Sequence, residues 1–152
     1  MKHLMRLSFV MLVVVGLLVG CGGATEDAGD AGATGDTAFK VTGMVGVEKA
    51  WTLAELKAMD TLEADYTNKD GETTTYTGVA INALLDEAGA EAGAATIALI
   101  ADDGYSADVT LDEIAGCANC IIGFRDDGRL MSVLPGFAGK VHVKGVVEMQ
   151  VK

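Results

Sequence analysis

Frequent turn-forming residues divide the chain from Phe39 onwards into short apolar or alternating runs. Asp-Gly pairs end at Gly71, Gly104 and Gly128, and each pair lies between two such runs. An Asp-Gly pair in this setting is a strong signal of a β-hairpin, because it suits the tight turn that joins two antiparallel strands. This spacing favours many short strands over long helices.

Eight runs have the length and residue content of β-strands. The run over 72–77 is rich in Thr and Tyr, which are enriched in strands. The final run alternates most regularly between apolar and polar residues, so we expect one of its faces to be buried. The expected strands are residues 39–45, 62–68, 72–77, 96–101, 105–110, 120–124, 130–134 and 141–151.

Two or three short helices are expected between these strands. Thr52 and Thr110 each stand three residues before a glutamate, Glu55 and Glu113. This is the capping box, in which the threonine hydroxyl and the glutamate carboxylate each accept a backbone N–H at the helix start. A further helix is predicted over 80–88, where apolar residues fall at helical spacing and a glycine follows. The sequence therefore predicts an α+β domain, mainly β, built on a mixed sheet.

Residues 1–20 have the layout of an export signal. Basic residues come first, and an apolar stretch then runs from Phe9 to Gly20, directly before Cys21. That stretch is well short of the roughly 20 residues that a membrane-spanning helix needs. The segment resembles a bacterial lipoprotein signal, which implies that Cys21 is lipidated and becomes the new N-terminus. The protein would then lie outside the cytoplasm, anchored to a membrane of the cell envelope. An ordinary secretory signal is the alternative.

Residues 21–38 are expected to be the lipidated cysteine and a flexible acidic linker. After Cys21 this segment contains only Gly, Ala, Thr, Asp and Glu, too little apolar surface to form a core. The folded domain is then residues 39–152. Without the signal, nine Lys and Arg stand against 22 Asp and Glu, a net charge of −13. Such a chain is a poor partner for nucleic acid. The expected partners are the membrane, through the anchor, and another envelope protein.

Cys117 and Cys120 form a Cys-Ala-Asn-Cys motif. In an exported chain such a pair favours a disulfide. A c-type haem would need a histidine directly after Cys120, and a closed zinc site would need two more ligands, whereas His142 is the one histidine of the domain. The open alternatives are a local disulfide, two buried thiols, or a redox pair.

Three phrases follow one another along the domain. The first runs from Tyr76 through Gly78 to Leu84-Leu85, the second is Asp-Gly-Tyr-Ser over 103–106, and the third is the glycine-rich segment over 135–144. In this order they resemble the molybdopterin-binding domain of the sulfite oxidase family, over about residues 39–152. The resemblance implies a mixed, mainly β fold. It also makes molybdopterin the cofactor to consider, although the residues by themselves assign none.

The resemblance also implies where a site would lie. In catalytic relatives a cysteine thiolate ligates molybdenum shortly before the first phrase, but the matching residues 61–69 contain no cysteine. Asp65 and Tyr66 would offer only oxygen there. The stretch that contacts the pterin phosphate matches 139–144, where the donors would be Lys140, His142 and Lys144. A solvated strand face explains the same alternation without any ligand, so no catalytic residue and no metal ligand is predicted.

Three hypotheses follow for function. The first is an exported lipoprotein whose domain has lost the metal thiolate and serves as a binding or accessory module. The second is a molybdopterin-dependent oxidoreductase, or a subunit of one, in which another ligand completes the metal and a partner carries the electrons. The third is a thiol-disulfide protein that uses Cys117 and Cys120.

Overall fold

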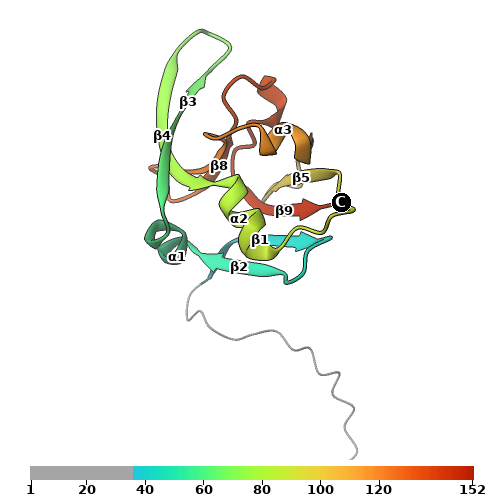
Figure 1. Ribbon diagram of the computed structural model, residues 1–152. Helices are drawn as coiled ribbons and strands as arrows, with labels where there is room; N and C mark the ends of the chain where they lie inside the picture. Colours follow the sequence, from blue (N-terminus) through green and yellow to red (C-terminus); the bar gives the residue numbers. More distant parts are fainter. Residues whose placement is uncertain (1–35) are drawn as a thin grey trace, which may run out of the picture. The chain divides into compact units, whose positions relative to one another are not determined.

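The computed structural model describes residues 36–152. The expected signal, Cys21 and most of the expected linker lie outside the described residues. The described part is an α+β domain that is mainly β, as predicted (Figure 1). Its strands are β1 (Thr37–Gly43), β2 (Lys49–Thr52), β3 (Thr61–Thr67), β4 (Thr73–Ala80), β5 (Thr96–Ala101), β6 (Ser106–Thr110), β7 (Ile121–Phe124), β8 (Leu130–Val133) and β9 (Val146–Val151). Its helices are α1 (Leu53–Ala58), α2 (Ile81–Ala88), α3 (Leu111–Ala115) and the 3-10 turn η1 (Gly139–Val141).

The strands form two sheets. The five-stranded sheet has the order β2-β1-β9-β5-β6, and the pairing of β1 with β9 is its only parallel one. The four-stranded sheet is antiparallel, in the order β3-β4-β7-β8. The main core draws fully buried residues from both sheets and from the helices, including Phe39, Leu56, Leu84, Ile114 and Met149.

The predicted turns and helix starts are confirmed. The three Asp-Gly pairs join β3 to β4, β5 to β6 and β7 to β8, and their glycines all have positive φ. Both capping boxes are formed at Thr52 and Thr110. Gly89 ends α2 in the left-handed conformation, where glycine is favoured because it lacks a Cβ. Strand β2 was not predicted, because its four residues are too few for a clear alternation.

The prediction of one strand over 141–151 is wrong. Residues 139–141 form η1, an irregular segment follows, and β9 begins only at Val146. Val141 and Val143 are buried as the alternation predicted, although Val147 is only half-buried. A positive φ at Gly145 breaks the extended backbone at this point. The alternation of the sequence therefore predicts the burial of Val141 and Val143 correctly, but it does not predict the backbone conformation.

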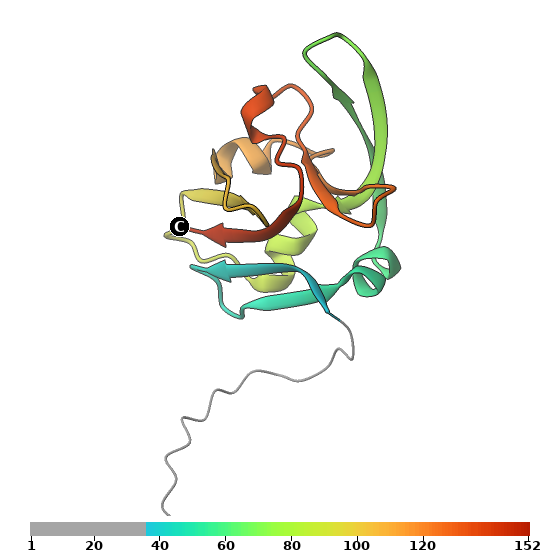
Figure 2. The ribbon, with the colours of Figure 1, turned by 180° about the vertical axis from the view of Figure 1, so that it is seen from behind.

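The β3–β4 hairpin projects from the rest of the domain (Figures 1 and 2). Strand β4 pairs with β3 from Thr73 to Val79, but it pairs with β7 only from Gly78 to Ala80. The outer half of β4 therefore has a neighbouring strand on one side alone within the described residues. This divergence opens the space around the hairpin in which the grooves described below lie.

Gly78 sits where β4 enters the four-stranded sheet. A Cβ at this position would lie 2.2 Å from the carbonyl oxygen of Ile122 and 2.6 Å from the Cα of Gly123, both backbone atoms. Backbone cannot yield as a flexible side chain does. The close approach of β4 and β7 thus requires glycine here.

We predict that Gly78→Ala destabilises the domain by about 2 to 4 kcal/mol, because the added methyl overlaps backbone atoms that cannot move independently. Urea unfolding followed by circular dichroism measures this. Gly139→Ala is the matched control, since a Cβ there meets nothing within 4 Å, and it should change stability by less than about 0.5 kcal/mol. Equal stability of both variants would contradict the account of Gly78.

Candidate functional site

A groove of about 630 Å³ lies between the tip of the β3–β4 hairpin and the segment that leads to β9. The hairpin lines it with residues 66–70, and Gly139 and Lys144 line it from the other segment. These are parts of the two stretches that the family resemblance singled out, residues 61–69 and 139–144. The fold therefore brings the two implied stretches together, although they are some seventy residues apart in the sequence.

A buried serine fixes the second wall of this groove. Ser132 on β8 is fully buried, and its Oγ donates to the carbonyl of Val141 and accepts from the N–H of Val143, each at 2.7 Å. Its own N–H donates to the carbonyl of Val143. One hydroxyl thus satisfies two main-chain groups in a segment that has no ladder of its own. The position of His142, between the two tethered residues, follows from this bridge.

His142 packs against the hairpin. Its ring centroid lies 4.8 Å from that of Tyr66, and its Nδ1 accepts a long hydrogen bond of 3.4 Å from the N–H of Leu134. Burial lowers the pKa of His142 below its ordinary value, and backbone hydrogen bonds at Phe137 and Ser132 offset part of this effect. The imidazole is therefore neutral at pH 7 and acts here as an acceptor, which makes it a poor partner for an anion.

The three predicted donors do not converge. Lys144 lines the groove with the hairpin, whereas Lys140 lines a separate groove of about 390 Å³ together with Asp108 and Glu113. The carbonyl of Lys140 accepts a hydrogen bond from the hydroxyl of Tyr105 at 2.8 Å. Since the segment is not a strand, residues 140, 142 and 144 do not share the single face that the alternation predicted.

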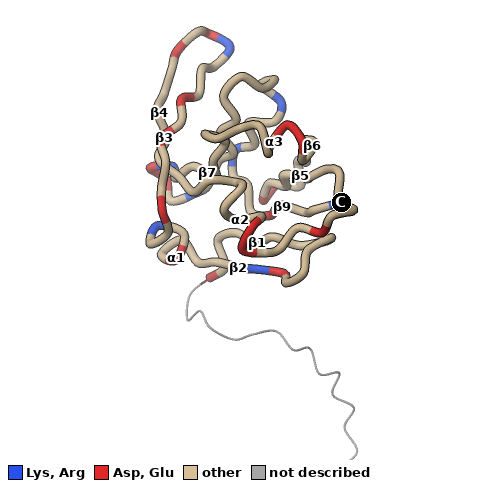
Figure 3. The backbone as a smooth tube through the Cα atoms, viewed as in Figure 1, with Lys and Arg blue, Asp and Glu red and all other residues tan. Residues whose placement is uncertain are grey.

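Lys69 joins Lys144 at the groove, and sequence reasoning missed it. The signal was available, because the Asp-Gly turn after Lys69 places it at the hairpin tip. Within the described residues neither lysine has an ion-pair partner. Acidic segments are spread over the domain and basic ones are few (Figure 3), so two lysines at one groove are a local exception to the charge of the chain.

The residues at this groove do not fit a molybdenum centre. The stretch over β3 supplies no sulfur, and the carboxylate of Asp65 accepts a 2.6 Å hydrogen bond from Thr75 on the neighbouring strand. Across residues 36–152, no group of three His, Cys, Asp or Glu side chains is placed to hold a metal ion. Val141, in the stretch that the resemblance matches to the pterin phosphate, is buried in the core.

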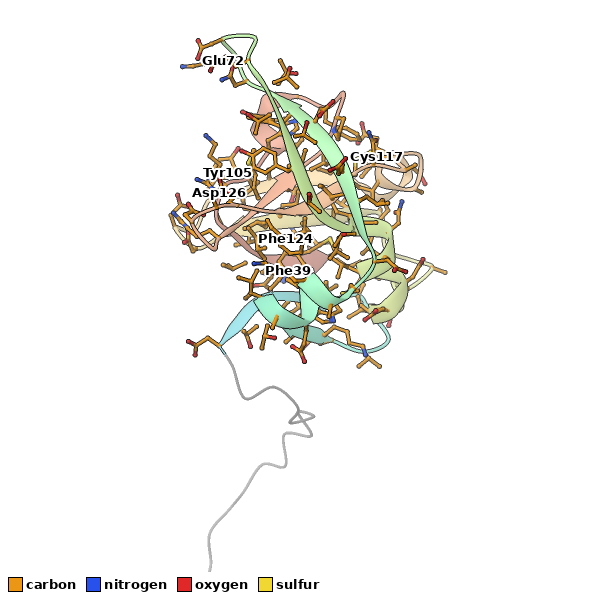
Figure 4. The ribbon with its side chains drawn as sticks, turned by 90° about the vertical axis from the view of Figure 1, so that its left-hand side faces the viewer. Phe39, Glu72, Tyr105, Cys117, Phe124 and Asp126 are labelled. Carbon is orange, nitrogen blue, oxygen red and sulfur yellow. A yellow bond between two sulfur atoms is a disulfide. The ribbon has the colours of Figure 1, made fainter. Side chains whose placement is uncertain are left out.

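Cys117 and Cys120 are joined as a disulfide in the connection between α3 and β7. Asn82 on α2 donates to the carbonyls of Ile114 and Cys117 and holds this connection against the helix. Neither cysteine lines the groove, and Figure 4 shows Cys117 and Tyr105 on opposite sides of the hairpin. The pair therefore provides no thiolate for a metal at the groove.

No helix among residues 36–152 combines the length and the apolar character needed to cross a bilayer.

Comparisons with known proteins find a relation at the level of the fold. No family model matches the chain, and no curated protein does either. Among solved structures, the chain is similar to the sulfane dehydrogenase SoxCD from Paracoccus pantotrophus, with a TM-score of 0.65 and 14% sequence identity. The match covers 80% of this chain and 39% of that one, so the chain spans about two-fifths of the matched structure.

This likeness agrees with the fold class predicted from the sequence. The domain has an α+β fold of the sulfite-oxidase type, with two sheets and three short helices. At this identity the likeness shows a distant relation of fold and nothing of the activity.

We predict that stability falls as the pH drops from about 7.5 to 5.5, and that His142→Gln removes most of this dependence. The folded state holds the pKa of His142 below that of the unfolded chain, so the unfolded chain binds the proton first. The contribution of neutral His142 to the free energy of unfolding is complete above the pKa of the unfolded chain, about 6.5. It is lost as the pH falls towards the lower pKa of the folded state.

Urea unfolding of both proteins across this range measures the effect. His142 is the one histidine of residues 36–152, so its proton resonances report the pKa directly. A pKa above 6.5 would contradict the burial argument.

Proposed function

We propose that this protein is an exported, lipid-anchored envelope protein whose sulfite-oxidase-type domain is a non-catalytic binding or accessory module. The proposal rests on one observation above all: the groove between the hairpin and residues 139–144 keeps cationic side chains but has no ligand for molybdenum. A metal thiolate needs a free cysteine, and the two cysteines of the described domain are bonded to each other.

The groove is suited to a small anion rather than to an extended cofactor. Lys69 and Lys144 offer two ammonium groups against one carboxylate in the lining, that of Asp70, and Asn68 and Tyr66 line the same space. Lysine ammonium binds anions as a point charge, without the bidentate geometry that arginine provides. The neutral His142 packs against Tyr66, with the two rings tilted by 51° to each other. Such a site recognises negative charge and size more than a particular shape.

The export and the anchor are supported by the sequence of the first 21 residues. Basic residues, a short apolar stretch and Cys21 follow one another as in lipoprotein signals. An acidic segment then separates Cys21 from β1, whose first residue is Thr37. On this proposal the domain works at a membrane surface, with its groove open to the surrounding compartment.

We predict that the full-length protein, extracted from its own membranes, carries far less than one equivalent of molybdenum. Mass spectrometry measures the metal, and fluorescence after oxidation measures the pterin. Pterin without metal would support the proposal of a binding module and would identify a pterin as its ligand. Near-stoichiometric metal and pterin would overturn the proposal and restore the molybdopterin-dependent oxidoreductase as the function.

We predict that Cys21→Ala abolishes incorporation of labelled palmitate and leaves the apolar signal uncleaved, because the thioether on Cys21 is the first step of lipoprotein maturation. Two or more acyl chains make a stable anchor, and the variant acquires none of them. Thr25→Ala, four residues away, is the control and should be labelled as the wild type is. Label on the Cys21→Ala protein would contradict the anchor.

A further inference from the structure

A second groove, of about 620 Å³, lies on the other strand of the hairpin. It is lined by residues 74–77 of β4, by Lys57 of α1 and by residues 124–128 at the β7–β8 turn. It shares no lining residue with the groove at Lys144. Figure 4 shows the hairpin running to its tip at Glu72, with Phe124 and Asp126 together on one side of it.

The β4 wall of this groove is an open strand edge. Asn68 donates its N–H to the carbonyl of Glu72, which makes these residues a hydrogen-bonded pair at the turn. Hydrogen-bonded pairs alternate along an antiparallel ladder, so Tyr66 and Thr74 form the next one and Asp65 and Thr75 do not. Thr75 therefore turns its backbone N–H and C=O away from β3 and towards the groove.

No strand of the described domain takes up these groups. Pairing of β4 with β7 begins at Gly78, and beyond it β7 continues towards its own turn with β8. The open stretch is rich in threonine, a β-branched residue that suits a strand. An unpaired edge of this kind is a template for one further strand.

The far wall decides which strand would fit. Arg125 and Asp127 neutralise each other in a 3.0 Å ion pair. Lys57 lies with its Nζ 5.8 Å from the centre of the Phe124 ring, and neither Lys57 nor Asp126 has an ion-pair partner among the described residues. The wall thus offers one aromatic ring, one cation and one anion.

We propose that this groove binds an extended segment of a partner protein, which adds to β4 as a strand and carries an acidic and a basic side chain for Lys57 and Asp126. Main-chain hydrogen bonds to Thr75 supply the affinity, and the charges set direction and register. A second copy of the chain is disfavoured as the occupant, because each copy without the signal carries a net charge of −13, from nine Lys and Arg against 22 Asp and Glu.

The test uses the full-length protein in detergent and a short peptide of alternating valine and threonine with one glutamate and one lysine. We expect saturable binding that protects the amide of Thr75 from hydrogen exchange. The same peptide, N-methylated along one edge, should bind about tenfold more weakly, because it loses main-chain hydrogen bonds and keeps its side chains. No saturable binding below about 1 mM, or equal binding of both peptides, would overturn the proposal.

Two matched variants locate the binding on β4. Thr75→Pro removes the N–H that faces the groove, whereas Asp65→Pro removes the N–H of its cross-strand neighbour, which faces the opposite edge. Both leave the β3–β4 ladder intact and both lose the Thr75–Asp65 hydrogen bond. We expect about tenfold weaker binding for Thr75→Pro alone. Equal losses in both variants would overturn the assignment to β4.

Lys57→Glu gives a second measurement if a proline variant fails to fold. It should weaken binding of the first peptide and restore it for a peptide in which the glutamate is replaced by lysine. Lys49→Glu, outside the groove, is the control and should leave binding unchanged. If the protein is a dimer and the Thr75→Pro substitution makes it monomeric, the occupant of the groove is a second copy of the chain. That result would overturn the choice of a partner strand.

Discussion

The buried hydroxyl of Ser132 is the interaction on which the rest of the structure most depends. It holds the end of η1 and the residues after it against the edge of β8, because its Oγ bonds the carbonyl of Val141 and the N–H of Val143, which no strand ladder takes up. That segment leads directly into β9, which lies at the centre of the other sheet between β1 and β5. A polar group buried with both partners is strongly favoured over one left unpaired. Together with the backbone hydrogen bonds of Ser132 to Val143 and of Gly145 to Leu130, this side chain holds the segment that leads into β9 against β8 and so helps to place the groove.

The limited pairing of β4 with β7 explains why a groove lies on each side of the β3–β4 hairpin. Gly78 lets β4 approach β7 closely for three residue pairs, and the chain then diverges, so the outer hairpin stands away from the sheet on both sides. One side faces the tethered segment with Lys144, and the other faces α1 and the β7–β8 turn. The groove at Lys144 and the open edge of β4 therefore share one scaffold, the β3–β4 ladder, without sharing a lining residue.

Local signals were enough for much of this fold. Asp-Gly pairs and capping boxes act within a few residues, and the hairpins and helix starts were therefore readable in the sequence. The segment after η1 could not be read in this way. Its alternation correctly reported that Val141 and Val143 are buried, but the side chain that replaces the missing ladder, Ser132, is supplied by another strand. The Asp-Gly turn placed Lys69 at the hairpin tip, but only the fold brings that tip to the groove with Lys144.

The electrostatics of the domain limit what the cationic groove can bind. The chain as a whole carries a formal charge of −11, which repels anions at a distance, while Lys69 and Lys144 attract them on contact. At physiological salt the repulsion from distant acids is screened beyond about 8 Å, whereas a direct contact is screened much less. A small anion that reaches both ammonium groups meets one carboxylate of the groove lining, that of Asp70, and stays away from the other acidic residues. A long polyanion would lie against the acidic surface as well, and this makes a compact ligand the better match for the site.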